Sequence, residues 1–339
     1  MGDVLIVVLM AVHLALVDLA MAGPLGCIWL EWRHTRHADS TADQVGRSLA
    51  WITQVSLLGG IASGVILVGI YWYRGSDEFF SAVGSIPASR LWFGALELAF
   101  SLACMITYWW LWRRWQSHRY LHRTLAAAAA SNLMIHFPAL FAIVSILSTH
   151  GEGVEQVLDR AAYQRWLIDP EVVSRVAHVW LAAVSVTAAV IMSLASRLRE
   201  PSADPLIRGG AQAALAATCL QLPIGMWLTM QMPESTREPL VGGDGLATTL
   251  FLTSLGLAMW LVQTLASLAQ GQGGSRMVQR ALAMMLLIVL LMTATLYRAK
   301  GCAKAVSLHS PSDEFKPSAI AFGPRPFDAP SCEYTGANV

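Results

Sequence analysis

Apolar stretches about 20 residues long recur along this chain, and this is the length that a helix needs to cross about 30 Å of hydrocarbon. Eight of them follow one another, at residues 4–29, 49–72, 91–112, 121–147, 172–194, 209–230, 246–268 and 278–297. Hydrophobic residues make up 55% of the sequence and charged residues only 13%, which is far from a soluble domain. We therefore expect an all-α integral membrane protein, a bundle of about eight transmembrane helices.

Basic residues are unevenly distributed among the connections between these stretches. The odd-numbered connections carry twelve arginines: Arg33, Arg36, Arg47, Arg113, Arg114, Arg119, Arg123, Arg197, Arg199, Arg208, Arg276 and Arg280. The even-numbered connections, such as GSDEFFSAVGS and QMPESTREPLVGGDG, hold fewer arginines and more acids. The positive-inside rule then predicts a multi-pass protein whose odd-numbered connections are cytoplasmic and whose two termini are extracytoplasmic. We interpret these arginines as topology signals of a protein embedded in a lipid bilayer. They therefore do not indicate a nucleic-acid partner.

The composition changes after Arg298, where the chain becomes polar and rich in Pro, Ser and Gly. We expect a membrane bundle over residues 1–300 and an extracytoplasmic tail over residues 301–339. Cys302 and Cys332 lie in this tail, where an oxidising compartment would allow them to pair. An ordered cap closed by that bridge and an unstructured tail with free thiols both stay open.

A few ionisable residues lie inside the predicted spans, where they are energetically expensive and therefore candidates for function. They are His13, Asp18, Glu97, His136, Arg175 and His178. At about 1.5 Å per residue, His13 lies roughly 14 Å from the outer end of its span, and Glu97 and His178 roughly 10 Å. His136 lies deeper. Helices of both directions thus bring unusual side chains into the outer half of the membrane.

Histidines and methionines at one level of a helical bundle are typical of haem binding, because haem iron takes His or His/Met axial ligands. We expect His178 to bind iron through one ring nitrogen. Arg175 is one turn earlier on the same face, where its guanidinium can pair with a haem propionate. The alternative is that each histidine only forms a hydrogen bond to a neighbouring helix.

A zinc or di-metal site is less favoured, because no two His or carboxylate residues share an i, i+3 or i, i+4 face inside the spans. His118 and His122 have that spacing, but they lie in an Arg-rich connection. There we expect both rings to face solvent or lipid headgroups.

Four segments, in order along residues 1–230, resemble subunit I of the cytochrome bd quinol oxidases. They are MAVHLALVDLAMAGPLGCIWLEW, GALELAF, SNLMIH and IDPEVVSRVAHVWLAAVSVTAAVIM. The resemblance implies that His13 is an axial ligand in the high-spin haem pocket and that His178 binds low-spin haem b. It further implies that Glu97 belongs to the proton path or the haem environment and that Arg175 holds a propionate.

The same resemblance implies further roles. A methionine serves the low-spin haem, either Met259 or Met226 or Met230. Asp18 is not matched to the family's pattern, and we interpret it, with Glu97, as a residue of the proton path in a protein that reduces oxygen. His136 matches no position of the family's pattern and is a candidate substitute ligand. The expected cofactor is one or more haem b.

The chain also departs from that family. The connection after the sixth span is short, where the family has a long quinol-binding loop, and the last two spans contain no Glu for another haem. Quinol oxidation, haem d and a full three-haem oxygen-reducing centre are therefore not favoured.

Three functions remain after this comparison. The first is a haem b subunit of the bacterial inner membrane, which carries electrons in a complex with other membrane subunits and whose tail docks a soluble carrier such as a cytochrome c. The second is a divergent terminal oxidase, an oxidoreductase that reduces oxygen at the His13 haem with protons passing Asp18 and Glu97. The third is a haem-free scaffold or transporter.

Overall fold

The computed structural model of the protein describes residues 2–115, 118–150, 157–198 and 200–309, and their regular structure is helical throughout. Eight helices are long and apolar enough to cross a membrane. They are α1 (Gly2–His37), α2 (Ser40–Tyr73), α4 (Ala88–Leu111), α5 (Arg119–His150), α7 (Pro170–Arg197), α8 (Asp204–Gln231), α10 (Gly245–Ala269) and α11 (Ser275–His309). The expected all-α membrane bundle is thus confirmed.

Most of these helices extend beyond the apolar stretches, and aspartates cap several of their beginnings. The carboxylate of Asp39 accepts a hydrogen bond from the Ala42 amide (3.0 Å) at the start of α2. Asp244 does the same for Ala247 (2.8 Å) at the start of α10. Such caps satisfy backbone donors that the first helical turn leaves unpaired.

Short helices fill several of the connections between the long helices. These are α3 (Asp77–Gly84), α6 (Arg160–Leu167), α9 (Glu234–Arg237) and the 3-10 turns η1 (Pro201–Ala203) and η2 (Glu238–Leu240). Ala82 of α3 and the following Ile86 are buried in one cluster with Ile143 of α5. The polar connections therefore carry a second layer of packed structure at one end of the bundle.

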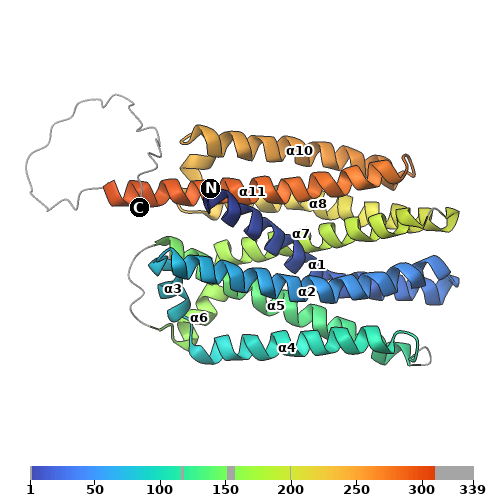
Figure 1. The fold of residues 1–339 in the computed structure, drawn as a ribbon. Coiled ribbons are helices and arrows are strands. Elements are labelled where there is room, and N and C mark those ends of the chain that lie inside the picture. The colour runs from blue at the N-terminus through green and yellow to red at the C-terminus, as the bar shows by residue number, and fades with distance from the viewer. Residues whose placement is uncertain (1, 116–117, 151–156, 199, 310–339) are drawn as a thin grey trace, which may run out of the picture.

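The long helices pack as sequential pairs, α1 with α2, α4 with α5, α7 with α8, and α10 with α11. α1 also contacts α5, α7 and α11, so it joins the two halves of the bundle. Figure 1 shows the beginning of α1 and the end of α11 at the same end of the bundle as α3 and α6. The Arg-rich connections between successive helices are at the opposite end.

The last helix runs past the point where the composition changes. α11 continues to His309, and Cys302 is buried within it. The Nζ atom of Lys304 forms an ion pair with Glu78 Oε1 of α3 at 2.6 Å, and this hydrogen bond holds the pKa of Glu78 below its usual range. Cys332 lies outside the described residues, so the Cys302–Cys332 bridge stays a prediction.

Candidate functional site

A cavity of about 2730 Å³ lies among the long helices, larger than the roughly 300–1,000 Å³ of ordinary small-molecule sites. Its lining is mostly apolar and comes from both halves of the bundle, α1, α2, α5 and α7 on one side and α8, α10 and α11 on the other. Seven of the residues singled out in the sequence line it: His13, Asp18, Arg175, His178, Met226, Met230 and Met259. The fold therefore gathers most of the candidate site from four separate helices, α1, α7, α8 and α10.

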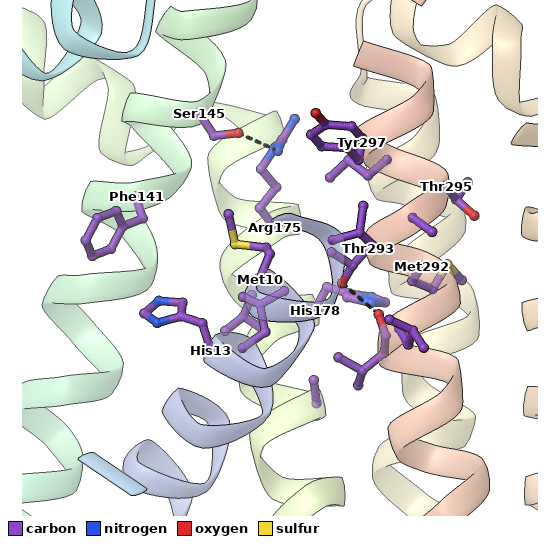
Figure 2. A pocket seen from close by; sticks show the side chains of 18 of the residues that line it. Met10, His13, Phe141, Ser145, Arg175, His178, Met292, Thr293, Thr295 and Tyr297 are labelled. Atoms are coloured by element: carbon purple, nitrogen blue, oxygen red, sulfur yellow. Dashed lines mark hydrogen bonds between the residues drawn. The ribbon is translucent and has the colours of Figure 1, made fainter. Parts of the chain in front are cut away.

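His178 has a ring nitrogen without a partner. Its Nδ1 is buried, and no hydrogen-bond partner lies within reach. The ring lies against Gly225 of α8, where a Cβ atom would stand 3.4 Å from the imidazole Cε1. Figure 2 shows the side chain between α7 and α11. Because buried polar atoms are nearly always paired, this nitrogen indicates a site for a bound group.

His13 has one engaged ring nitrogen and one that no neighbour claims. Its Nδ1 lies 2.9 Å from the Gly60 carbonyl oxygen and 3.2 Å from Ser63 Oγ, both on α2. A carbonyl only accepts, so Nδ1 carries the proton and Nε2 keeps a lone pair, as in histidines that bind metals. In Figure 2 the ring points toward α5 and Phe141, away from His178.

A basic cluster stands one turn from His178. The Nη2 of Arg175 donates to Glu171 Oε1 (2.5 Å) and its Nη1 to Ser145 Oγ (3.4 Å), while its buried Nε has no partner. Lys300 of α11 donates its Nζ to the same Ser145 hydroxyl at 2.8 Å. Arg175 and Lys300 thus donate to one hydroxyl and have one carboxylate, Glu171, beside them, which leaves positive charge to attract an anion. Figure 2 shows the hydrogen bond between Arg175 and Ser145.

Sequence reasoning missed Ser145 and Lys300. Ser145 is one of many serines in the spans, and Lys300 stands where the polar tail was expected to begin. The signal that could have found Lys300 is the run AKGCAKA after Tyr297, because these residues can continue the helix of the last span.

The methionines surround the cavity without singling out one ligand. Met226 and Met230 come from α8 and Met259 from α10. Met292 of α11 also lines the cavity, and its sulfur accepts a hydrogen bond from Ser254 Oγ at 3.3 Å. That a methionine sulfur binds haem iron therefore stays a prediction, and several methionines are candidates for it.

Two expected site residues lie elsewhere. Glu97 and His136 are outside the cavity lining, and they pair with each other, with His136 Nε2 at 3.0 Å from Glu97 Oε1. Asn132 of α5 supports them by donating to the Glu97 carbonyl (2.7 Å) and to Ser101 Oγ (2.8 Å). The structure thus separates a polar group on α4 and α5 from the cavity, and Asp18 is the buried carboxyl group inside the cavity.

The expectation for His122 is wrong. Its ring is only 3% exposed and is held between Glu31 and Tyr108, whereas His118 is exposed as expected. Sequence spacing could not reveal this, since Glu31 is 91 residues away in the chain.

The cavity fits a haem better than a metal ion held by protein alone. Within the part of the chain that the structure describes, no three His, Cys, Asp or Glu side chains are placed to hold a metal ion together. A haem supplies the porphyrin ligands itself and needs only one or two from the protein. An unpartnered His178 nitrogen, an open His13 nitrogen and a basic cluster in an apolar cavity meet that requirement.

The fold of this chain is similar to that of a solved bd oxidase. The structure is similar to the solved structure of bd oxidase from Geobacillus thermodenitrificans, with a TM-score of 0.70 and 12% sequence identity over 91% of this chain and 89% of that chain. No protein-family model matches the sequence, and no curated protein matches it. The likeness establishes a bd-oxidase-like fold.

Proposed function

We propose that this protein is a haem b-binding membrane subunit of the bd-oxidase type, which carries electrons within a respiratory or electron-transfer complex. The observation that carries the proposal is the His178 ring, whose buried Nδ1 lacks a partner beside a large apolar cavity. The bd-oxidase-like fold supports it, because the similar structure belongs to an oxidase.

Five side chains of the cavity have a task in this proposal. His178 and His13 would hold haem iron, and a bound haem would supply one-electron transfer. Arg175 and Lys300 would pair with the carboxylates of a bound haem. The apolar lining would exclude water, and Asp18, which lines the same cavity as His13, would hold a proton.

Oxygen reduction is the second candidate function. It is favoured by the placement of Asp18 and His13 on α1 in one cavity, since reducing oxygen needs a proton donor near the open haem face. In either case we infer that other membrane subunits complete the complex, because a half-exposed His136 at membrane depth is costly unless protein covers it. The soluble carrier stays a prediction, since most of the tail lies outside the described residues.

A spectroscopic experiment tests the proposal directly. The complex is purified from membranes, its haem is quantified as the pyridine haemochrome, and reduced-minus-oxidised spectra are recorded for the wild type and for His178→Ala. The wild type should contain haem b, and His178→Ala should lose the low-spin signal, because low-spin iron needs two strong axial ligands. His118→Ala removes an exposed histidine at the other end of the bundle and should leave the spectrum unchanged.

The outcomes separate the candidates. Oxygen uptake by the wild-type complex, lost in His13→Ala, would favour the oxidase. Haem without oxygen uptake would favour the electron-carrying subunit. An absence of haem from the intact complex, or an unchanged His178→Ala spectrum, would overturn the proposal.

A further inference from the structure

A buried cluster of ionisable groups lies far from the cavity, near the Arg-rich connections. It joins Glu31 at the end of α1, Tyr108 on α4 and His122 at the start of α5, and all three side chains are buried. The rings of Tyr108 and His122 stack with centroids 4.0 Å apart and planes 16° from parallel. This cluster has no part in the function proposed for the cavity.

The hydrogen bonds of His122 fix how many protons the cluster holds. Its Nε2 lies 2.8 Å from the Tyr108 carbonyl oxygen, which only accepts, so Nε2 must carry a proton. Its Nδ1 lies 3.0 Å from Glu31 Oε2, and a contact of that length needs one proton between the two atoms. Either His122 is an imidazolium beside a carboxylate, or it is neutral beside a protonated Glu31.

Both forms of the pair hold one proton more than a neutral His122 and an ionised Glu31 would hold together. Without that proton, the Nδ1 lone pair would face a carboxylate oxygen at 3.0 Å between two buried side chains. The Tyr108 hydroxyl also donates to Glu31 Oε2, at 3.2 Å, and so supports the carboxylate form. The geometry therefore defines a site that holds a single shared proton.

Other charged and titratable groups face the pair from each neighbouring helix. They are Cys27 and His34 of α1, Asp43 of α2, and Arg119 and Arg123 of α5. The Nε of Arg123 lies 3.6 Å from Glu31 Oε1, and Asp43 accepts a hydrogen bond from Trp112 Nε1 at 2.9 Å. The shared proton is therefore held in a polar pocket with both signs of charge.

A small cavity connects the pair with the surface. Its volume is about 10 Å³, close to the smallest space that holds one water, and Glu31 and His122 line it together with the partly exposed Trp115. One water in this cavity would bridge the buried pair and the aqueous edge of the bundle.

We propose that Glu31 and His122 form a one-proton binding site at the Arg-rich end of the bundle, which exchanges its proton with the adjacent aqueous phase through this one-water cavity. Polar side chains lead onward from it along α2, α4 and α5: Gln54, Ser101 and Glu97 are buried, and Asn132 is partly buried. On α4, Ser101 stands seven residues from Tyr108, or about 10 Å. The Glu31–His122 site thus lies at the Arg-rich end of a row of polar side chains, and the Glu97–His136 pair lies at the other end of that row.

The test reads the ring nitrogens of His122 by NMR. The full chain is labelled with ¹⁵N-histidine in lipid nanodiscs at pH 7.5, and the His122 signals are assigned by their loss in His122→Asn. The Nδ1 resonance of the wild type should have the shift of a protonated or proton-sharing nitrogen. In Glu31→Gln it should move to the shift of an unprotonated nitrogen, while Asp43→Asn, in the same pocket, should leave it in place.

Transfer to D2O separates a proton-exchanging site from a structural cross-link. The shared proton should exchange within seconds, whereas backbone amides of α1 and α5 at the same level should stay protected for hours. An unprotonated Nδ1 in the wild type, a wild-type shift in Glu31→Gln, or exchange as slow as the amides would each overturn the proposal. If Glu31→Gln does not fold, the wild-type shift and exchange rate decide alone.

Discussion

At the scale of single residues, each histidine of the cavity rests against a glycine of the next helix. A Cβ on Gly64 would stand 3.1 Å from His13 Cε1, tighter than ordinary packing, whereas a Cβ on Gly225 would stand 3.4 Å from His178 Cε1. The backbone of α2 can therefore come close enough for His13 to reach Gly60 and Ser63. Small residues at such crossings are what allow membrane helices to approach.

Gly64→Ala should displace the His13 ring. We expect a net loss of up to about 2 kcal/mol of stability, because overpacking costs about 1–3 kcal/mol and alanine regains about 1 kcal/mol of helix propensity. The haem signal that depends on His13 should shift as well. Gly69→Ala, five residues further on α2 with nothing within 4 Å of the new Cβ, should be neutral or stabilising in thermal unfolding. Equal effects of the two variants would contradict this account of the packing.

Lys300→Gln should lower the reduction potential of a haem in the cavity. The amide keeps a hydrogen bond to Ser145 but removes a positive charge that favours the reduced state. A charge about 10 Å from the redox centre, at an effective dielectric constant of about 20, contributes about 1.7 kcal/mol, or about 70 mV for one electron. Redox titration of the purified complex measures this shift. Arg114→Gln makes the same charge change at the opposite end and should leave the potential nearly unchanged.

At the scale of helices, the length and apolar character of the stretches predicted the eight spans, because every segment that crosses a lipid bilayer must be a long apolar helix. They could not predict α3 or α6, which are short amphipathic helices stabilised by contacts with distant segments. The candidate site, too, was predictable only where the local sequence carried the signal. His13 and His178 were visible because an imidazole in an apolar run is unusual, whereas the pairing of His122 with Glu31 depends on contacts between distant segments.

The ion pair between Asp244 and Arg298 joins α10 to α11 and should make stability depend on pH. Hydrogen bonds from Arg298, including one of 3.0 Å to Asp244 Oδ2, hold the pKa of Asp244 below its usual range. A lowered folded-state pKa means that the contribution is complete above the ordinary value of about 4 and is lost as the pH falls through the lowered value.

Two variants divide the roles of Asp244. Asp244→Asn keeps a good helix cap and should cost about 1 kcal/mol or less, the contribution of the ion pair. Asp244→Ala should cost about 1 kcal/mol more, because the Ala247 amide also loses its acceptor. Thermal unfolding at pH 7 and near pH 2 should show the Asn variant and the wild type converging in acid. A difference that persists unchanged at low pH would show that the ion pair is not its source.

At the scale of the whole molecule, the two ends of the bundle carry different chemistry. Arg175 lies near the start of α7 and Lys300 near the end of α11, whereas Glu31 lies near the end of α1 and His122 near the start of α5. Figure 1 shows the start of α1 and the end of α11 at one end of the bundle and the connection from α1 to α2 at the opposite end. If the arginines face the cytoplasm, the proton site opens to the cytoplasm and the basic cluster lies near the outer surface. Orientation therefore decides the side from which protons and electrons arrive.

Reporter fusions test that orientation. Alkaline phosphatase fused after Val339 should be active, because this enzyme folds only outside the cytoplasm. Green fluorescent protein fused there should be dark, because it does not fold after export through the general pathway. Insertion at Gln272, between α10 and α11 in an Arg-rich connection, should give the opposite pair of results. Replacing Arg276 and Arg280 by Gln should weaken this asymmetry, since the basic residues nearest the spans set it. Fluorescence at the C-terminus with phosphatase activity at Gln272 would place the Glu31–His122 site on the outer side and reverse the direction of proton uptake inferred from it.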